Sequence, residues 1–184
     1  MKARQKAGAK AKAVKAQVRT PSKTHRHAAH PLEGKHAPDF RLADAAGKEI
    51  TLGDLTKARA LVLYFYPKDM TPGCTAEACA FRDHLSAIQA LGAAVAGISG
   101  DSADSHRKFT EKNQLNFPLL SDPGYKVARL YGVYRKKTLY GREFMGIERT
   151  TFVIGRDGVV RKVFAKVKVN GHAEAVIEAV KELG

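Results

Sequence analysis

Short apolar runs alternate along the chain with longer segments whose apolar residues recur every three or four positions. Residues 60–66 (ALVLYFY) are apolar throughout and residues 93–98 nearly so, which is typical of β-strands covered on both faces. Residues 74–91 carry apolar side chains at helical spacing. Similar patterns predict a β-hairpin at 38–52, helices at 102–113, 125–131 and 173–183, and strands at 117–120, 150–154 and 159–165.

The order of these elements indicates the fold class. Strands that alternate with helices form a parallel core, whereas strands linked by a hairpin turn such as residues 155–158 (GRDG) run antiparallel. We therefore predict an α/β domain with a thioredoxin-like fold, in which helices flank a mixed β-sheet that begins with an N-terminal β-hairpin. There is no internal repeat, and the one visible boundary, near residue 34, gives a domain over 34–184.

The positive charge is concentrated ahead of that boundary. The net charge of the chain is +14, and residues 1–36 account for +9 of it, with ten Lys and Arg against one acid, Glu33. Residues 1–33 are rich in Lys, Ala and His and nearly lack large apolar side chains, so they cannot bury enough surface to offset their ordering entropy. We predict a disordered basic tail over residues 1–33.

Several roles are open for this tail. It is a solubilising extension in the simplest interpretation, and non-specific contact with nucleic acid or another polyanion is the main alternative. The scarcity of Ser and Arg counts against an organelle transit peptide, and a secretory signal is excluded because no apolar core segment is present. Weak metal binding by His25, His27 and His30 is the least favoured role.

Composition also limits the setting and the chemistry. No apolar run approaches the ~20 residues that cross a bilayer, so no membrane association is predicted. Cys74 and Cys79, the only two cysteines, are too few for a disulfide scaffold, and a reducing, cytoplasmic location follows as the default. Zinc is disfavoured because no second pair of ligands accompanies the cysteines.

Cys74 lies where a thiol becomes reactive. Pro72 and Gly73 interrupt the chain after the strand at 60–66, which puts Cys74 in the first turn of the next helix. Unpaired backbone N–H groups and the helix dipole favour an anion there, and the thiolate is the reactive form of cysteine. Thr71 can direct its hydroxyl to the same place, either as a helix cap or as a hydrogen-bond partner of sulfur or substrate.

The spacing of the two cysteines excludes a disulfide on an intact helix. Positions i and i+5 lie ~8–9 Å apart on different sides of a helix, beyond the ~7 Å that a disulfide allows. Cys74 and Cys79 can therefore pair only if the first turns of the helix unwind. Oxidation of one thiolate to a sulfenic acid, followed by condensation with the other thiol, is a sequence of steps that would use such a switch.

The motif around Cys74 resembles a known family. Residues 67–74 (PKDMTPGC) match the Pro-x-x-x-Thr-x-x-Cys motif of peroxiredoxins, and residues 75–83 (TAEACAFRD) resemble the peroxiredoxin Q subgroup, also called bacterioferritin comigratory protein. The resemblance continues through 97–102 (GISGDS), 116–123 (NFPLLSDP) and 146–154 (GIERTTFVI). It covers the chain from about residue 34 onward and leaves out only the basic tail.

The resemblance implies roles for particular residues. It makes Cys74 the peroxidatic cysteine, Cys79 the resolving cysteine, Thr71 the hydroxyl that orients the peroxide and Pro67 a shield against water. It assigns the distant arginine of the family to Arg149, whose guanidinium would stabilise both the thiolate and the departing oxygen. Two further residues, Glu77 and Arg82, are weaker candidates for a supporting layer, because a helical pair at i and i+5 is poorly aligned.

The sequence thus predicts a thiol peroxidase that reduces hydrogen peroxide or organic hydroperoxides, without metal or organic cofactor. A dithiol protein such as thioredoxin would recycle the intrachain disulfide, and the enzyme is expected to be a monomer. A dithiol–disulfide oxidoreductase on the same fold is one alternative, which the five-residue spacing disfavours. A redox sensor that associates with nucleic acid or another polyanion through its basic tail is the other.

Overall fold

The computed structural model of the chain describes residues 30–139 and 141–183. Most of the predicted basic tail, including His25 and His27, lies outside the described residues. Residues 30–33 lie within them and form a turn next to the domain, where the ring of His30 packs edge-on against Phe152. The backbone N–H of the following Gly34 donates to the carbonyl of Val160, which joins this segment to the sheet.

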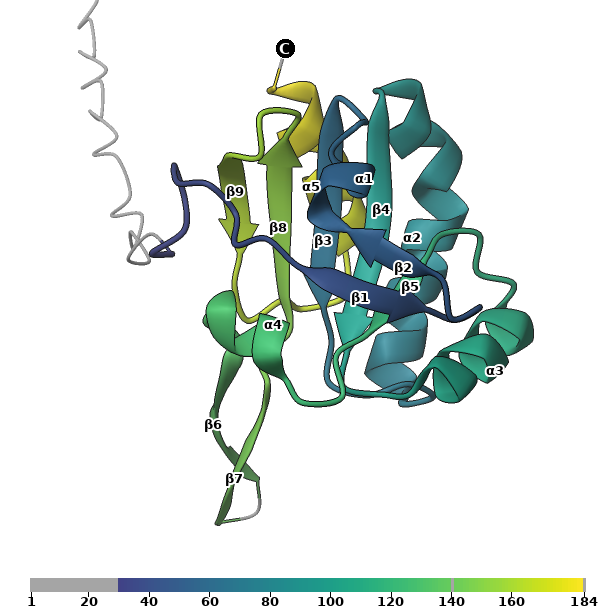
Figure 1. Cartoon of the computed structure of the whole chain (residues 1–184), viewed down its shortest axis with the longest axis vertical. Coiled ribbons are helices and arrows are strands. Elements are labelled where there is room, and N and C mark those ends of the chain that lie inside the picture. Colours follow the sequence, from purple (N-terminus) through teal and green to yellow (C-terminus); the bar gives the residue numbers. More distant parts are fainter. Residues whose placement is uncertain (1–29, 140, 184) are drawn as a thin grey trace, which may run out of the picture.

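Seven strands form a mixed β-sheet in the order β2-β1-β5-β4-β3-β8-β9 (Figure 1). The strands are β1 (Arg41–Asp44), β2 (Glu49–Thr51), β3 (Ala60–Phe65), β4 (Ala93–Ser99), β5 (Leu119–Ser121), β8 (Thr150–Gly155) and β9 (Val160–Phe164). The central strands β5, β4 and β3 run parallel, and the strands on both sides of them pair antiparallel. The predicted mixed sheet and its N-terminal hairpin, β1–β2, are confirmed.

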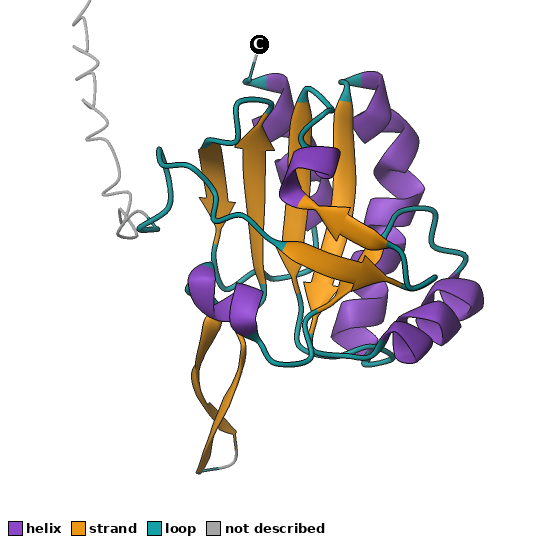
Figure 2. Cartoon of the chain, in the orientation of Figure 1, coloured by secondary structure: helices purple, strands orange, loops and turns teal. Residues whose placement is uncertain are grey.

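Helices cover both faces of this sheet (Figure 2). They are α1 (Leu52–Leu55), α2 (Pro72–Ala90), α3 (Ala103–Asn113), α4 (Lys126–Leu130) and α5 (His172–Lys181). The long helices α2 and α5 pack against each other on one face, and α1 and α4 lie on the other (Figure 1). None of the helices in the described part of the chain is both long enough and apolar enough to cross a membrane.

Strand β3 shows why its sequence is apolar throughout. Its residues alternate between two hydrophobic cores: Val62 and Tyr64 pack with the side chains of α2 and α5, whereas Leu61 and Leu63 pack with those of α4 and the N-terminal segment. All six residues of β3 are buried. Each face of the strand therefore loses contact with water, which is the main stabilising contribution at this position.

Three elements are absent from the sequence-based expectation, namely the two strands of a hairpin and one short helix. Strands β6 (Tyr134–Leu139) and β7 (Arg142–Ile147) form a separate two-stranded hairpin that projects from the body of the domain (Figure 1). The segment is rich in Lys and Arg, and β7 is mostly exposed, so it has no buried face to produce a clear apolar pattern. The one-turn helix α1 is specified by a capping box between Thr51 and Asp54 rather than by periodicity.

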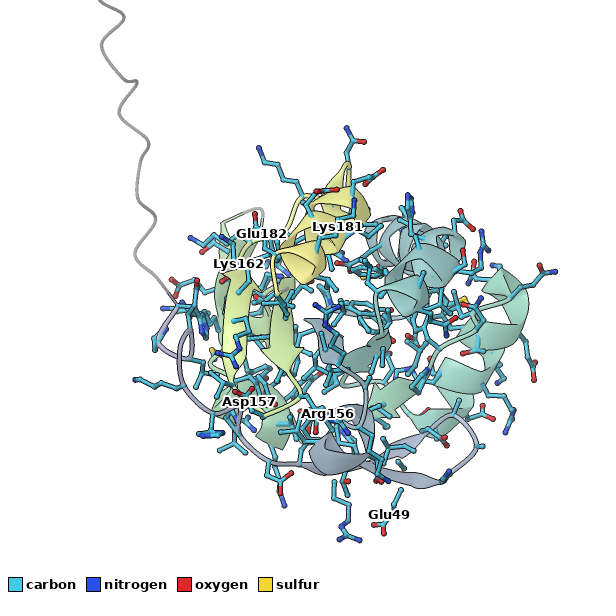
Figure 3. All side chains as sticks on the ribbon, turned by 90° about the horizontal axis from the view of Figure 1, so that it is seen from above. Glu49, Arg156, Asp157, Lys162, Lys181 and Glu182 are labelled. Atoms are coloured by element: carbon cyan, nitrogen blue, oxygen red, sulfur yellow. The ribbon has the colours of Figure 1, made fainter. Side chains whose placement is uncertain are left out.

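The pairing of β3 with β8 fixes the place of the candidate site. Phe65 pairs with Thr150 and Ala60 with Gly155, so the segment after β3 and the residue before β8 lie at the same end of the sheet. The turn between β8 and β9 lies at the opposite end, where its exposed residues Arg156 and Asp157 are seen together with other charged side chains of the surface (Figure 3).

Candidate active site

Helix α2 places Cys74 at the end of strand β3. Thr71 occupies the N-cap position and Pro72 the first helical turn, two residues before the start that periodicity predicts. Cys74 is therefore the third residue of the helix, where backbone N–H groups lack an intrahelical partner and the helix dipole is positive. Its side chain is only 2% exposed. The local sequence thus produces a buried thiol at the position in a helix that best accommodates a thiolate.

Arg149, immediately before β8, contacts Cys74 directly. Its Nη2 lies 3.2 Å from the Cys74 Sγ, although the two residues are 75 positions apart in the sequence. A Cβ atom on Gly73 would lie 3.3 Å from the same nitrogen, so a glycine at this position leaves room for the guanidinium. Structure and sequence therefore agree in bringing together the candidate nucleophile and a fixed positive charge.

Glu77 holds the other side of this guanidinium. It lies one turn after Cys74, is only 1% exposed, and accepts a hydrogen bond from Nη1 of Arg149. Burial raises the pKa of Glu77 to about 7, although the charge of Arg149 and its hydrogen bond oppose this rise. The carboxylate and the sulfur thus flank one arginine, and Glu77 fixes where the guanidinium points.

Thr71 and Pro67 lie on the segment that leads into the helix. The Thr71 hydroxyl does not cap α2 and instead donates to the carbonyl of Lys68 at 3.0 Å. Since a hydroxyl also accepts hydrogen bonds, its oxygen keeps lone pairs for a substrate. Pro67 is half-buried directly after Tyr66 and begins this segment. The expected roles of both residues toward a peroxide stay predictions.

Cys79 has a different environment on the same helix. It is half-buried, and its Sγ has one hydrogen-bond partner among the described residues, Oδ1 of Asn113 at the end of α3, at a long distance of 3.9 Å. The neighbouring Arg82 donates to the backbone carbonyl of Asn113 and forms an ion pair with Asp83. It does not pair with Glu77, as the unfavourable i, i+5 spacing of the two residues indicates. Both cysteines are free thiols, and α2 is unbroken between them.

Comparison with known proteins identifies the family. A model of the AhpC/TSA family matches residues 34–163, which is more than two thirds of the chain. The chain belongs to the AhpC/TSA family. A putative peroxiredoxin Bcp of Helicobacter pylori is 50% identical over 146 residues, 79% of this chain and 95% of the relative. Peroxiredoxin Bcp of Bacillus subtilis is 45% identical over 150 residues, 82% of this chain and 95% of the relative.

Solved structures give the same answer for the fold. Peroxiredoxin Q of Xanthomonas campestris, as a single-residue mutant, superposes with a TM-score of 0.75 at 41% identity, covering 79% of this chain and 92% of the other. A peroxidoxin BcpB of Mycobacterium tuberculosis superposes with a TM-score of 0.75 at 37% identity, covering 83% and 98%. The predicted resemblance to the peroxiredoxin Q subgroup and the thioredoxin-like fold are confirmed, and the chain is a thiol peroxidase of the peroxiredoxin type.

This peroxiredoxin also holds site-adjacent residues that sequence reasoning missed. Asp69 and His106 are buried and hydrogen-bonded to each other behind the segment that carries Thr71. His172 lies on the far side of the site, 2.8 Å from the Thr151 hydroxyl, and its pKa is lowered to about 4 by burial and then by the charge of Arg149. A single Asp or His carries no periodic signal, so nothing in the sequence distinguished these residues from surface groups.

Proposed function

We propose that Cys74 is the nucleophile that reduces a hydroperoxide and that Cys79 resolves the product. The observation that carries the proposal is the 3.2 Å contact between Arg149 Nη2 and Cys74 Sγ. A guanidinium at that distance stabilises the thiolate, and its remaining N–H groups can donate to an oxygen on which negative charge develops. Glu77 holds the guanidinium in that position from the opposite side.

The first step transfers two electrons from sulfur to the peroxide. The Cys74 thiolate attacks one peroxide oxygen, the O–O bond breaks, and Cys74 becomes a sulfenic acid. The departing oxygen takes a proton and leaves as water or as an alcohol. Thr71 would orient the peroxide through its hydroxyl, and Pro67 would keep water from the sulfur. Both assignments rest on the motif and on the position of residues 67–71 beside Cys74.

The second step forms the disulfide. The Cys79 thiol condenses with the sulfenic acid, an S–S bond forms, and water leaves. Residues at i and i+5 of an intact helix are ~8–9 Å apart, so the first turns of α2 must unwind before the sulfurs can meet. The weak hydrogen bond of Cys79 supports this order of events, because its sulfur gives up no strong polar interaction when it moves.

Peroxiredoxins use peroxide substrates and thioredoxin-like dithiol reductants, and we extend both to this chain. One matched protein, a bacterioferritin comigratory protein of Xanthomonas campestris, is described as reducing alkyl peroxides. We propose that this enzyme accepts hydrogen peroxide and organic hydroperoxides and is recycled by thioredoxin. An intrachain resolving cysteine needs no second subunit, which supports a monomer, and the low cysteine content supports a reducing, cytoplasmic setting.

The basic tail remains a separate prediction. Residues 1–33 would contact polyanions non-specifically, and salt-dependent retention on DNA that disappears on their deletion would support that role. Such contact would hold the peroxidase near a polyanion without changing its chemistry.

A coupled assay tests the proposed chemistry. Wild type should consume hydrogen peroxide continuously with thioredoxin as reductant, Cys74→Ser should consume none, and Cys79→Ser should stop after a single turnover. Turnover by Cys74→Ser would exclude Cys74 as the nucleophile. A preference for protein disulfides over peroxide as oxidant would favour the alternative, a dithiol–disulfide oxidoreductase.

A further inference from the structure

A buried polar cluster lies behind the segment that joins β3 to α2. At its centre is the Asp69 carboxylate, which accepts hydrogen bonds from the Tyr66 hydroxyl at 2.7 Å, the Ser105 hydroxyl at 2.7 Å and Nδ1 of His106 at 2.8 Å. Asp69 is 3% exposed and His106 is fully buried. Because a carboxylate only accepts, His106 must carry its proton on Nδ1 in this contact.

The backbone of Asp69 is fixed as well. Its N–H donates to Oδ2 of Asp101 at 2.9 Å, and the same carboxylate accepts from the Ser99 hydroxyl at 2.7 Å. Asp69 is therefore held through its main chain by the segment after β4 and through its side chain by the first turn of α3. The segment before α2 is thus tied at this one residue to residues 101–106, which lie more than thirty positions away in the sequence.

The residue that follows Asp69 has a strained backbone. Met70 adopts a φ of 60°, in the left-handed region that residues other than glycine rarely occupy. Its side chain is 43% exposed, so packing of that side chain does not hold the conformation. Thr71 comes directly after it. The anchor at Asp69, together with the hydrogen bond from the Thr71 hydroxyl to the Lys68 carbonyl, thus sets the path of the chain into α2.

The cluster has an energetic cost that packing alone would not require. A buried carboxylate loses its hydration, and hydrogen bonds must compensate for that loss. They do so for Asp69. Burial alone would raise the pKa of this carboxyl, but the hydrogen bonds from His106, Tyr66 and Ser105 outweigh that effect and lower the pKa. His106 keeps a buried Nε2 without a partner among the described residues. An apolar cluster would avoid both costs, so a requirement for position accounts better for these residues.

We propose that Asp69 and His106 are positioning residues for peroxide reduction, which hold residues 67–71 so that Thr71 and Pro67 face the Cys74 sulfur. The inference rests on the proposed function of Cys74. It concerns neither the thiolate itself, which Arg149 and the start of α2 stabilise, nor the later condensation with Cys79. It separates two properties of the site: the reactivity of the sulfur and the placement of the substrate next to it.

Two variants at His106 distinguish positioning from packing. His106→Asn is smaller than the native residue, but its amide nitrogen can occupy the place of Nδ1 and donate to Asp69. His106→Leu fills a similar volume without a donor. If the hydrogen bond to Asp69 matters, the second-order rate constant for oxidation of Cys74 by hydrogen peroxide should fall about tenfold to a hundredfold in His106→Leu and substantially less in His106→Asn. A role in packing predicts the reverse order.

Alkylation of Cys74 by iodoacetamide, measured in a Cys79→Ser background, is the second readout. Alkylation needs an accessible thiolate but no oriented peroxide, so it should proceed at similar rates in His106→Leu and in the parent protein. Thr110→Val is a matched control on the same helix, because the buried hydroxyl of Thr110 has no hydrogen-bond partner among the described residues. It should leave the rates of both reactions unchanged.

The outcomes separate the inference from the function on which it rests. Slower oxidation with unchanged alkylation in His106→Leu, together with recovery in His106→Asn, supports positioning. Equal loss of both reactions, or oxidation as fast as in the parent protein, would overturn it. If the parent protein itself fails to react with peroxide, the proposed function of Cys74 fails instead.

Discussion

The two cysteines of α2 lie five residues apart, yet their surroundings differ in nearly every respect. Cys74 is 2% exposed, lies in the first turn of the helix and contacts the guanidinium of Arg149 at 3.2 Å. Cys79 is half-buried in the second turn, and its one hydrogen bond among the described residues is a long one, 3.9 Å to Asn113. The sulfur of Cys74 thus has a close charged partner, whereas the sulfur of Cys79 has only a weak polar one.

The difference explains how one helix can supply both steps of the reaction. Reactivity toward peroxide requires a fixed thiolate with donors around it, because electrostatic stabilisation works best when the groups are already in place. Resolution requires movement, because the two sulfurs cannot meet on an intact helix. A thiol whose hydrogen bond is long and weak loses little polar interaction when its turn unwinds. The reaction therefore requires one cysteine that is held in place and a second one that can move.

The largest expected effect comes from Arg149, the arginine beside Cys74. Arg149→Ala should slow oxidation of Cys74 by peroxide by about 10²–10³-fold, since it removes a donor aimed at the developing oxygen charge. Arg82→Ala, which acts near Cys79 and Asn113, should leave that rate unchanged. Stopped-flow kinetics with hydrogen peroxide measures both. Equal losses in the two variants would show that the site near Cys74 is not electrostatically distinct.

Glu77 should make the free energy of unfolding of the protein depend on pH. Its folded-state pKa, about 7, lies above the ordinary 4.5, so the stability it contributes is complete below pH 4.5 and is lost as the pH rises toward 7. Glu77→Gln keeps the neutral form at every pH. The stability of this variant relative to wild type should therefore increase between pH 4.5 and 7, by roughly 3 kcal/mol at most. Urea unfolding across this range measures the difference, and a constant difference would contradict the account.

Oxidation should loosen the helix between the two sulfurs. Formation of the disulfide requires unwinding near residues 74–81, so these amides should lose about tenfold or more of their protection from hydrogen exchange in the oxidised protein. The later turns of α2, which pack against α5, serve as an internal control and should stay protected. Identical protection in both redox states would contradict the need for unwinding.

The smallest effect is expected at the contact of Cys79. Asn113→Ala removes a long and weak interaction, so the rate of disulfide formation should change by less than about threefold, in either direction. Rapid quenching of the oxidised enzyme followed by thiol labelling measures that rate. A large decrease would mean that Asn113 guides Cys79 toward the sulfenic acid, and that Cys79 is not loosely held.

The sequence predicted the features that depend on neighbouring residues. The apolar run of β3 and the helical spacing of α2 are local patterns, and they gave these elements to within about two residues. The β6–β7 hairpin was missed because β6 is rich in Lys and Arg and most residues of β7 are exposed, so neither strand shows a regular apolar pattern. The contact between Arg149 and Cys74 spans 75 positions and was expected from the resemblance to peroxiredoxins, not from any pattern.

Other parts of the site could not be predicted because they depend on the fold. Glu77 was a weak candidate from the sequence, but its pairing with Arg149, 72 positions away, depends on the approach of the segment before β8. Asp69 and His106 are 37 positions apart, and nothing in either segment indicates that the two side chains are buried together. Periodicity reports which face of an element is buried. It does not report which polar groups meet there.

Intact mass combined with a count of free thiols, before and after one equivalent of hydrogen peroxide, tests the division of roles most directly. Wild type should lose both thiols and about 2 Da, whereas Cys79→Ser should gain about 16 Da as the sulfenic acid of Cys74 accumulates. That result would establish a reactive cysteine and a resolving cysteine on one helix. If neither protein changes within minutes, Cys74 is not an activated thiolate, and the central claim is wrong.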